Sequence, residues 1–322
     1  MPAPRPQDVL VKVARLYYLE DRSQGDIAKQ LGVSRSSVSR ILTSAREQGV
    51  VEIRIHPPGQ LTRVGELEDA FKREFGIAEP RIVRRPTGRA PIDIVGEMAA
   101  RVFESQVAHL STVGLSWGYT ISQFVEHVSL EPIYRDLHLF PLAGGMPTGD
   151  TGPSGNTSLE TLAHKCGATA YRFESPSVVE SRQTWQALSG ESAIVAAIER
   201  AANVRMAVIG IGSYGVRSSA RVMEAMGLNP DEKAETEARH PAGDLNGRFF
   251  DIDGVPLGPP TSERVIGVSM EQLAKVPQVY GLCGGVDKAR GLVGALRTGV
   301  LDGVVVDEDL AAAALKVARH EH

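Results

Sequence analysis

Hydrophobic residues in the first fifty positions recur at intervals of three and four, which is the spacing of helices that bury one face. This spacing predicts three short helices, over residues 9–19, 23–31 and 35–48. A run of β-branched residues at 50–55 alternates partly with charged residues and predicts a short strand. Three helices followed by such a strand are typical of a winged helix-turn-helix domain.

The segment between the second and third helices predicts a tight turn. Ser23 and Ser34 occupy N-cap positions, where a hydroxyl accepts a hydrogen bond from a free backbone amide. Gly32 supplies the left-handed residue that ends a helix, and Val33 after it is expected to enter the core. The alternative is a small three-helix unit whose polar face is only solvated.

One face of the third helix carries short hydroxyl side chains among arginines. Arginine can donate two hydrogen bonds to guanine, serine and threonine can reach bases or phosphates, and short side chains let a helix approach the major groove. We therefore predict that this helix, its N-cap and the first residues of the second helix bind a double-stranded DNA operator. The predicted DNA-binding residues are Ser23, Gln24, Ser34, Arg35, Ser36, Ser37, Ser39, Arg40 and Thr43.

A Pro-Pro-Gly segment at residues 57–59 cannot continue a strand and predicts a domain boundary. A helix is expected over 61–75, either coupling or dimerising the two halves or simply packing on the larger one. Beyond it strand-like and helical segments alternate, which predicts an α/β domain with a largely parallel, Rossmann-like sheet. The predicted organisation is a DNA-binding domain over 1–56, a linker with a coupling helix over 57–78, and an effector-binding domain over 79–322.

Three glycine-rich segments join strands to helices in the larger domain, at residues 114–120, 143–152 and 282–288. Ligands of parallel sheets bind at the carboxyl ends of the strands, where such turns offer backbone amides. Lys288 begins a helix and would form a phosphate cradle with the amides before it, and Asp244 could accept hydrogen bonds from sugar hydroxyls. The predicted effector-binding residues are Ser116, Trp117, Gly118, Thr120, Gly144, Gly145, Asp244 and Lys288.

Two other motifs receive less specific interpretations. Residues 210–215 match the glycine pattern of dinucleotide-binding proteins, but no strand follows at the required distance, so a turn beside the same ligand pocket is favoured. The sequence Asn246-Gly247 predicts a hairpin, and Asp251 and Asp253 near it are assigned to turn chemistry rather than to a metal. The sequence predicts neither a metal site nor a cofactor.

Composition and charge agree with a division into a DNA-binding domain and a larger effector-binding domain. A length of 322 residues is typical of about two domains. No apolar stretch is long enough to span a membrane, and no secretory leader is recognised, so a cytoplasmic protein is expected. The net charge of −4 hides a difference: residues 1–56 contain nine basic and six acidic side chains, a net charge of +3, which leaves −7 for the remainder. A basic segment on an acidic body indicates that only the segment meets DNA.

The motifs also resemble those of SorC-type sugar-binding transcriptional regulators. Residues 26–40 resemble their helix-turn-helix, and strings at 113–120, 141–145, 208–213, 243–254, 265–269 and 284–297 occur in the family's order. The resemblance covers about residues 8–316. It implies a domain similar to sugar phosphate isomerases and deaminases, Asp244 and Lys288 in contact with a sugar or sugar phosphate, and dimers or tetramers on palindromic operators.

An enzyme similar to sugar phosphate isomerases or deaminases, with an accessory helical domain, is the alternative. Such an enzyme needs a positioned base or nucleophile. The sequence contains no H-E-x-x-H motif, no cysteine and histidine stand in a convincing relation, and its histidines are scattered. We therefore predict a regulator of carbohydrate metabolism genes, not an enzyme, whose operator binding responds to the bound metabolite.

Overall fold

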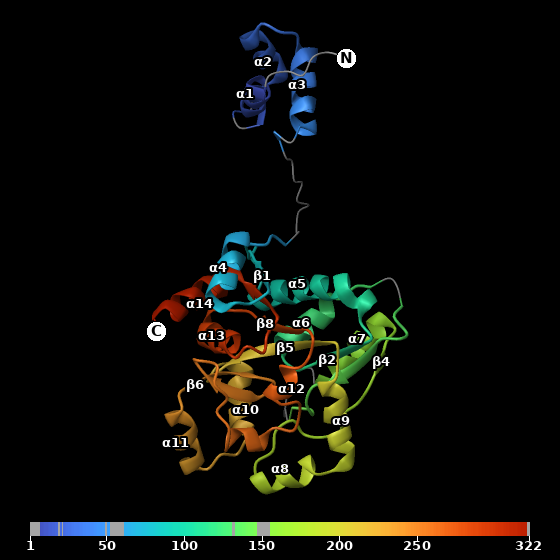
Figure 1. Cartoon of the computed structure of the whole chain (residues 1–322), viewed down its shortest axis with the longest axis vertical. Coiled ribbons are helices and arrows are strands. Elements are labelled where there is room, and N and C mark those ends of the chain that lie inside the picture. Colours follow the sequence, from blue (N-terminus) through green and yellow to red (C-terminus); the bar gives the residue numbers. More distant parts are fainter. Residues whose placement is uncertain are drawn as a thin grey trace. The chain divides into compact units, whose positions relative to one another are not determined.

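The computed structural model describes residues 7–18, 20, 22–48, 50–51, 61–130, 133–146 and 155–320. The chain forms two compact units, residues 1–60 and 61–322, which are described separately (Figure 1). Most of the strand predicted at 50–55, from residue 52 onwards, lies outside the described residues.

The first unit contains three helices around a small apolar core. They are α1 (Gln7–Tyr18), α2 (Gln24–Leu31) and α3 (Arg35–Glu47). Its fully buried residues include Leu10, Ile27 and Val38, one from each helix. The Ser23 hydroxyl accepts a hydrogen bond from the Asp26 amide, and the Ser34 hydroxyl accepts one from the Ser37 amide, so both predicted N-caps are confirmed.

The turn between α2 and α3 differs from the prediction at one residue. Gly32 is left-handed, with a φ of 63°, and ends α2 as expected. The expectation that Val33 enters the core is wrong, because its side chain is 40% exposed. The Val33 amide donates to the Ala28 carbonyl and closes the helix end through the backbone, while Leu31 makes the apolar contact with the core.

The second unit is built on a parallel sheet, as predicted. Its parallel strands lie in the order β1, β9, β8, β5, β2, β3, β4, and a hairpin of β6 and β7 pairs antiparallel with the end of β5. Without β1, the order is the 3-2-1-4-5-6 order of doubly wound folds. The strands are β1 (Glu79–Val83), β2 (Thr112–Leu115), β3 (His138–Pro141), β4 (Thr169–Ala170), β5 (Met206–Ser213), β6 (Pro241–Leu245), β7 (Arg248–Asp251), β8 (Val279–Cys283) and β9 (Gly303–Asp307).

Helices cover both faces of this sheet. One apolar core lies under α5, α6 and α7, and the other lies under α4, α13 and α14. Strand β9 contributes side chains to both cores. Val305 packs under α5, α6 and α7, and its neighbours Val304 and Val306 pack under α4, α13 and α14. The helices are α4 (Gly65–Phe75), α5 (Pro91–Gln106), α6 (Tyr119–His127), α7 (Gly155–Cys166), α8 (Arg182–Ser189), α9 (Ser192–Ala202), α10 (Arg217–Ala225), α11 (Pro230–Ala238), α12 (Met270–Leu273), α13 (Ala289–Arg297) and α14 (Glu308–His320).

Helix α4 belongs to the second unit, which favours the packing alternative for this segment. Phe71 is fully buried in the core against α14 and β1. Glu68 is also buried; its carboxylate accepts hydrogen bonds from the Arg63 guanidinium at 2.6 and 2.8 Å and from the Ile82 amide at 3.0 Å. Across the described residues, no helix is long and apolar enough to cross a membrane.

Candidate functional site

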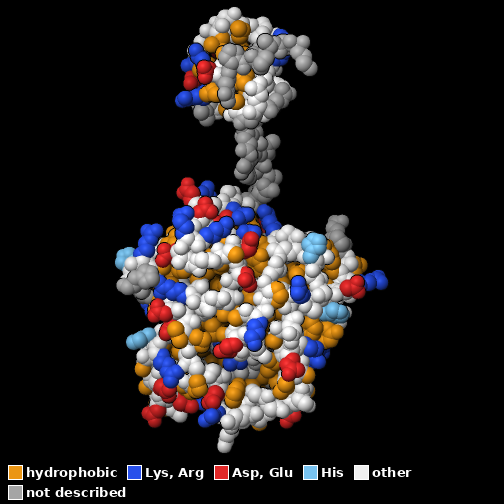
Figure 2. All heavy atoms as spheres, in the orientation of Figure 1, with side chains coloured by type: hydrophobic (Ala, Val, Ile, Leu, Met, Phe, Trp, Pro, Cys, Tyr) orange, Lys and Arg blue, Asp and Glu red, His pale blue; other side chains and the backbone are white. Residues whose placement is uncertain are grey.

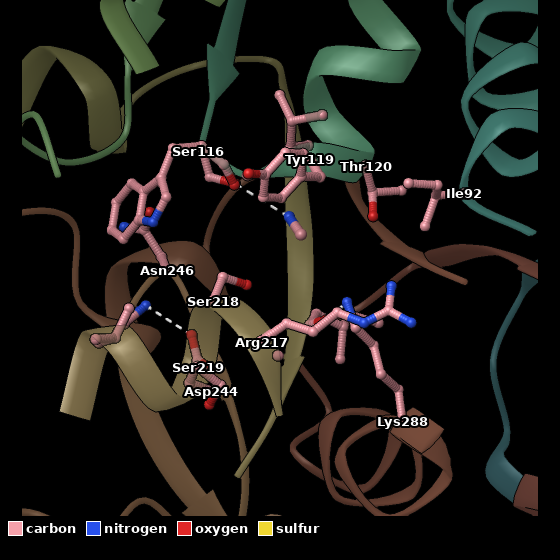
Figure 3. A pocket seen from close by; sticks show the side chains of 18 residues that line it. Ile92, Ser116, Tyr119, Thr120, Arg217, Ser218, Ser219, Asp244, Asn246 and Lys288 are labelled. Atoms are coloured by element: carbon pink, nitrogen blue, oxygen red, sulfur yellow. Dashed lines mark hydrogen bonds between the residues drawn. The ribbon is translucent and has the colours of Figure 1, made fainter. Parts of the chain in front are cut away.

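A cavity of about 260 Å³ opens between the carboxyl ends of β2 and β5 (Figure 3). These strands are neighbours, but the chain continues from β2 towards β3 and from β5 towards β8, on opposite sides. Such a reversal leaves a crevice above the sheet, the usual ligand position in doubly wound folds. The lining residues are Ile92, Ser116, Trp117, Gly118, Tyr119, Thr120, Ile121, Gly210, Ile211, Gly212, Arg217, Ser218, Ser219, Val222, Asp244, Asn246, Gly247 and Lys288.

Six of the eight predicted effector-binding residues line this cavity. They are Ser116, Trp117, Gly118, Thr120, Asp244 and Lys288. The turn from β2 into α6 supplies the first four, and Gly118, with a φ of 122°, adopts a conformation that favours glycine. The Ser116 hydroxyl accepts a hydrogen bond from the Gly210 amide at 3.0 Å and joins the two strands at the cavity.

Gly144 and Gly145 do not line the cavity. Their amides donate to the carbonyls of Ile266 and Ser175, and a side chain on Gly144 would collide with the backbone of Ser175 and Pro176. Close backbone packing thus explains the glycine at position 144, whereas a side chain at position 145 would meet no atom within 4 Å. The prediction that this turn completes the pocket is therefore wrong for these two residues, and residues 147–152 of the turn lie outside the described part of the chain.

Asp244 is placed by the β6–β7 hairpin, whose turn is Asn246-Gly247, as predicted. Strand β6 pairs Asp244 with Gly212 of β5, and a side chain on Gly212 would collide with the Asp244 carboxylate. This carboxylate is buried and accepts a hydrogen bond from the Gly247 amide at 3.1 Å. Burial raises the pKa of Asp244, against the lowering effects of the Ser219 hydroxyl, the Gly247 amide and the Lys288 ammonium.

Lys288 lies at the end of a short 3₁₀ turn, Val286–Lys288, directly before α13. Its side chain is buried, and its Nζ donates to the Ile211 carbonyl at 3.2 Å. The predicted cradle of loop amides is wrong. The Gly285 amide donates to the buried Asp307 carboxylate at 2.8 Å, and Lys288 is the one residue of the 282–288 segment that lines the cavity.

The predicted DNA-binding residues all lie in α2, α3 and their caps. Most are exposed, whereas Gln24 and Ser37 are half-buried. The hydroxyls of Ser36 and Ser37 each lie 2.9 Å from the Ser34 hydroxyl at the start of α3. Among the described residues, the Arg40 guanidinium donates a hydrogen bond to the Ser36 carbonyl of its own helix, and the Arg35 side chain makes no hydrogen bond or ion pair. The two guanidinium groups are thus available to a partner.

The larger unit matches a family model described as "Putative sugar-binding domain" over residues 60–316. Residues 4–48 match a model described as "Sigma-70, region 4". The crystal structure of the full-length sorbitol operon regulator SorC from Klebsiella pneumoniae superimposes with a TM-score of 0.69 at 27% identity, covering 96% of this chain and 98% of that one. This chain belongs to the SorC family of sugar-binding transcriptional regulators. The deoxyribonucleoside regulator of Bacillus subtilis is 26% identical over 314 residues, covering 95% of this chain and 97% of the relative.

Family membership makes the chain a DNA-binding transcriptional regulator with a sugar-binding domain, as predicted. The glycine-rich segment 210–215 of this SorC-family domain is not part of a dinucleotide-binding unit. After α10 and α11 the chain returns as β6, antiparallel to β5, instead of as a second parallel strand. Gly210 and Gly212 lie in β5 and line the cavity, whereas Tyr214 and Gly215 lie in the turn after the strand. The segment is therefore beside the pocket, but its first four residues are strand.

Sequence reasoning missed several residues that line the cavity of this SorC-family protein. Arg217, Ser218 and Ser219 begin two residues after the glycine-rich segment, and Asn246 lies two residues after Asp244, so proximity in sequence was a usable signal. Ile92 comes from the start of α5 and no local pattern pointed to it. Within the described residues no cluster of three or more histidine, cysteine, aspartate or glutamate side chains is arranged to hold a metal.

Proposed function

We propose that this protein regulates carbohydrate metabolism genes and that a sugar, a sugar phosphate or a related metabolite in the cavity modulates its operator binding. The observation that carries the proposal is the placement of Asp244 and Lys288, both buried, in a cavity at the reversal point of the sheet. The cavity lies just below the range of about 300–1,000 Å³ usual for small-molecule sites, which suits a small metabolite better than a dinucleotide.

The chemistry of the lining supports a ligand with several hydroxyl groups. Asp244 is an acceptor for such hydroxyls, and Lys288 is a donor. Asn246 donates its side-chain amide to the Leu142 carbonyl at 3.1 Å, and its Oδ1 atom has no partner among the described residues. A buried acceptor of this kind favours a ligand that donates a hydrogen bond.

The same lining supports a binding site more than a catalytic one. It contains neither histidine nor cysteine, and Asp244 is its one carboxylate: Oδ2 accepts a backbone hydrogen bond, and Oδ1 has no partner among the described residues. An isomerase needs a positioned general base, and Asp244 is the one carboxylate of the lining that could serve as that base. The relatives named above are regulators by name, which agrees with this reading.

We expect the protein to act as a homodimer or homotetramer. A palindromic operator requires two recognition helices about one DNA turn apart, which a symmetric assembly provides. Sedimentation with and without operator DNA measures this directly.

The function is tested by a thermal-shift screen of sugars, polyols and their phosphates, followed by operator binding with each hit. A ligand at one hundred times its Kd should add about 2.7 kcal/mol of stability. Lys288→Ala should abolish the response of operator binding to the hit while leaving operator affinity unchanged. Conversion of a sugar phosphate with saturable kinetics would instead support the enzyme, and unchanged effector affinity in Lys288→Ala would remove Lys288 from the site.

A further inference from the structure

An ion pair joins the two loops on one side of the cavity. Arg217 begins α10, directly after the turn that follows β5, and Asp287 precedes Lys288 in the loop after β8. Because β5 and β8 are neighbours in the sheet, these loops lie side by side. The Arg217 Nη2 atom is 3.3 Å from the Asp287 Oδ2 atom, and about half of each side chain is exposed. Arg217 lines the cavity, whereas Asp287 does not.

The backbone holds Arg217 in an unusual conformation. Its φ is +46°, in the left-handed region that costs free energy for residues other than glycine. Among the described residues the other non-glycine examples are His240 and Asn246, and Asn246 also lines the cavity. Backbone strain of this kind persists where the surrounding structure enforces it, and it is concentrated at ligand sites.

The charges of the cavity are separated. In Figure 3 the side chains of Arg217 and Lys288 lie on one side, and those of Asp244, Ser219 and Asn246 lie on the other. Lys288 is engaged with a backbone carbonyl, so Arg217 is the more accessible of the two cations. Figure 2 shows positive and negative side chains interspersed over the visible face of the larger unit, and residues 57–322 carry a net charge of −7. Attraction of an anion must therefore come from local groups such as Arg217.

The geometry points to Arg217 as the residue that makes the cavity selective for an effector with an anionic group, phosphate or carboxylate. Asp287 then competes with the anionic group of the effector for the Arg217 guanidinium. The inference rests on the proposed function. A half-exposed ion pair contributes little to stability, so an anion in the cavity can replace Asp287 at small cost. The guanidinium would then form a bidentate, charge-assisted interaction with the ligand, while the hydroxyl groups of the ligand face Asp244.

The competition predicts opposite effects for the two partners of the ion pair. Arg217→Gln removes the cation and should weaken the binding of an anion roughly tenfold or more. Asp287→Asn removes the competing carboxylate and should strengthen it. If the pair only fixed the two loops, both substitutions would weaken binding.

The experiment uses the full-length protein and two probes at matched ionic strength, inorganic phosphate and sorbitol 6-phosphate, with affinities from thermal shift and calorimetry. Sorbitol, the neutral counterpart of the second probe, should be insensitive to both substitutions. Arg182→Gln is the control, because Arg182 is likewise exposed, forms an ion pair with Glu263 at 3.0 Å and does not line the cavity.

Opposite shifts for Arg217→Gln and Asp287→Asn support the inference. Shifts in the same direction, no shift in either variant, or no binding of either anionic probe to the unmodified protein overturn it. Operator release by a neutral sugar, without binding of either anion, would leave the proposed function standing and refute the inference alone.

Discussion

The DNA-binding face and the effector cavity expose their polar groups in opposite ways. The face takes all its predicted residues from a stretch between Ser23 and Thr43, and most of them are exposed. The cavity collects side chains from four separate strand ends and from α5, and its main charged groups, Asp244 and Lys288, are buried. Substitutions on the face should therefore change binding without changing stability, whereas substitutions of the buried groups that hold the cavity loops in place should lower stability.

The largest effect on stability is expected at Asp307, which holds the loop that precedes Lys288 and the start of α14. It is fully buried; one carboxylate oxygen accepts from the Gly285 amide at 2.8 Å and the other accepts from the Leu310 amide in the first turn of α14 at 3.1 Å. Asp307→Ala leaves a buried amide unpaired and removes a helix cap, so the free energy of unfolding should fall by about 2–4 kcal/mol. Urea unfolding measures the loss. A change below about 1 kcal/mol would contradict the support that we assign to this carboxylate.

Arg35 and Arg40 test the opposite side of the comparison. Because both side chains are exposed, Arg35→Ala and Arg40→Ala should each weaken operator binding by about 1–3 kcal/mol, and the free energy of unfolding should change by less than about 0.5 kcal/mol. Fluorescence anisotropy with labelled operator measures the first quantity, and effector affinity should be unchanged. Arg182→Ala on the larger unit serves as a control, and normal operator affinity in both variants would refute the placement of the recognition helix.

Asp244→Asn separates binding from folding within the cavity. Loss of the carboxylate should weaken effector binding about tenfold or more. Folding itself should not suffer, since burial raises the pKa of Asp244 and ionisation is therefore harder in the folded state. The folded protein accordingly loses stability as pH rises from the unfolded-state pKa through the higher folded-state pKa. The variant should lack this part of the pH dependence. If the assignment is wrong, the free energy of unfolding of the variant will change with acidic pH as steeply as that of the unmodified protein.

The two regions were also unequally predictable from the sequence. The caps at Ser23 and Ser34 and the Asn246-Gly247 turn follow from contacts within four residues, and all were predicted. The cavity depends on which strand ends become neighbours. Gly144 was misplaced because glycine also permits close backbone packing, as it does here against Ser175.

The helices α8, α10 and α11 show a related difficulty. They were not predicted, although α11 begins with the capping box of Asn229 and Glu232. None of the residues of α8 is fully buried, and its apolar side is short: Trp185 and Leu188 pack on the core, which is a weak signal for helix prediction. Arg217 begins α10 and was missed together with it, because a residue at a strand end becomes part of a site only through the sheet order.

The smallest effect is expected at Val33, and it tests the one error within the otherwise predictable first unit. Val33 is 40% exposed and Val38 of α3 is fully buried, so the two valines form a matched pair. Val38→Ala removes two buried methyl groups and should cost about 2–3 kcal/mol, whereas Val33→Ala should change stability by less than about 0.5 kcal/mol. Amide hydrogen exchange of α1 to α3 in the full chain measures both. Equal losses would mean that Val33 does belong to the core, and that the turn follows the pattern first expected from the sequence.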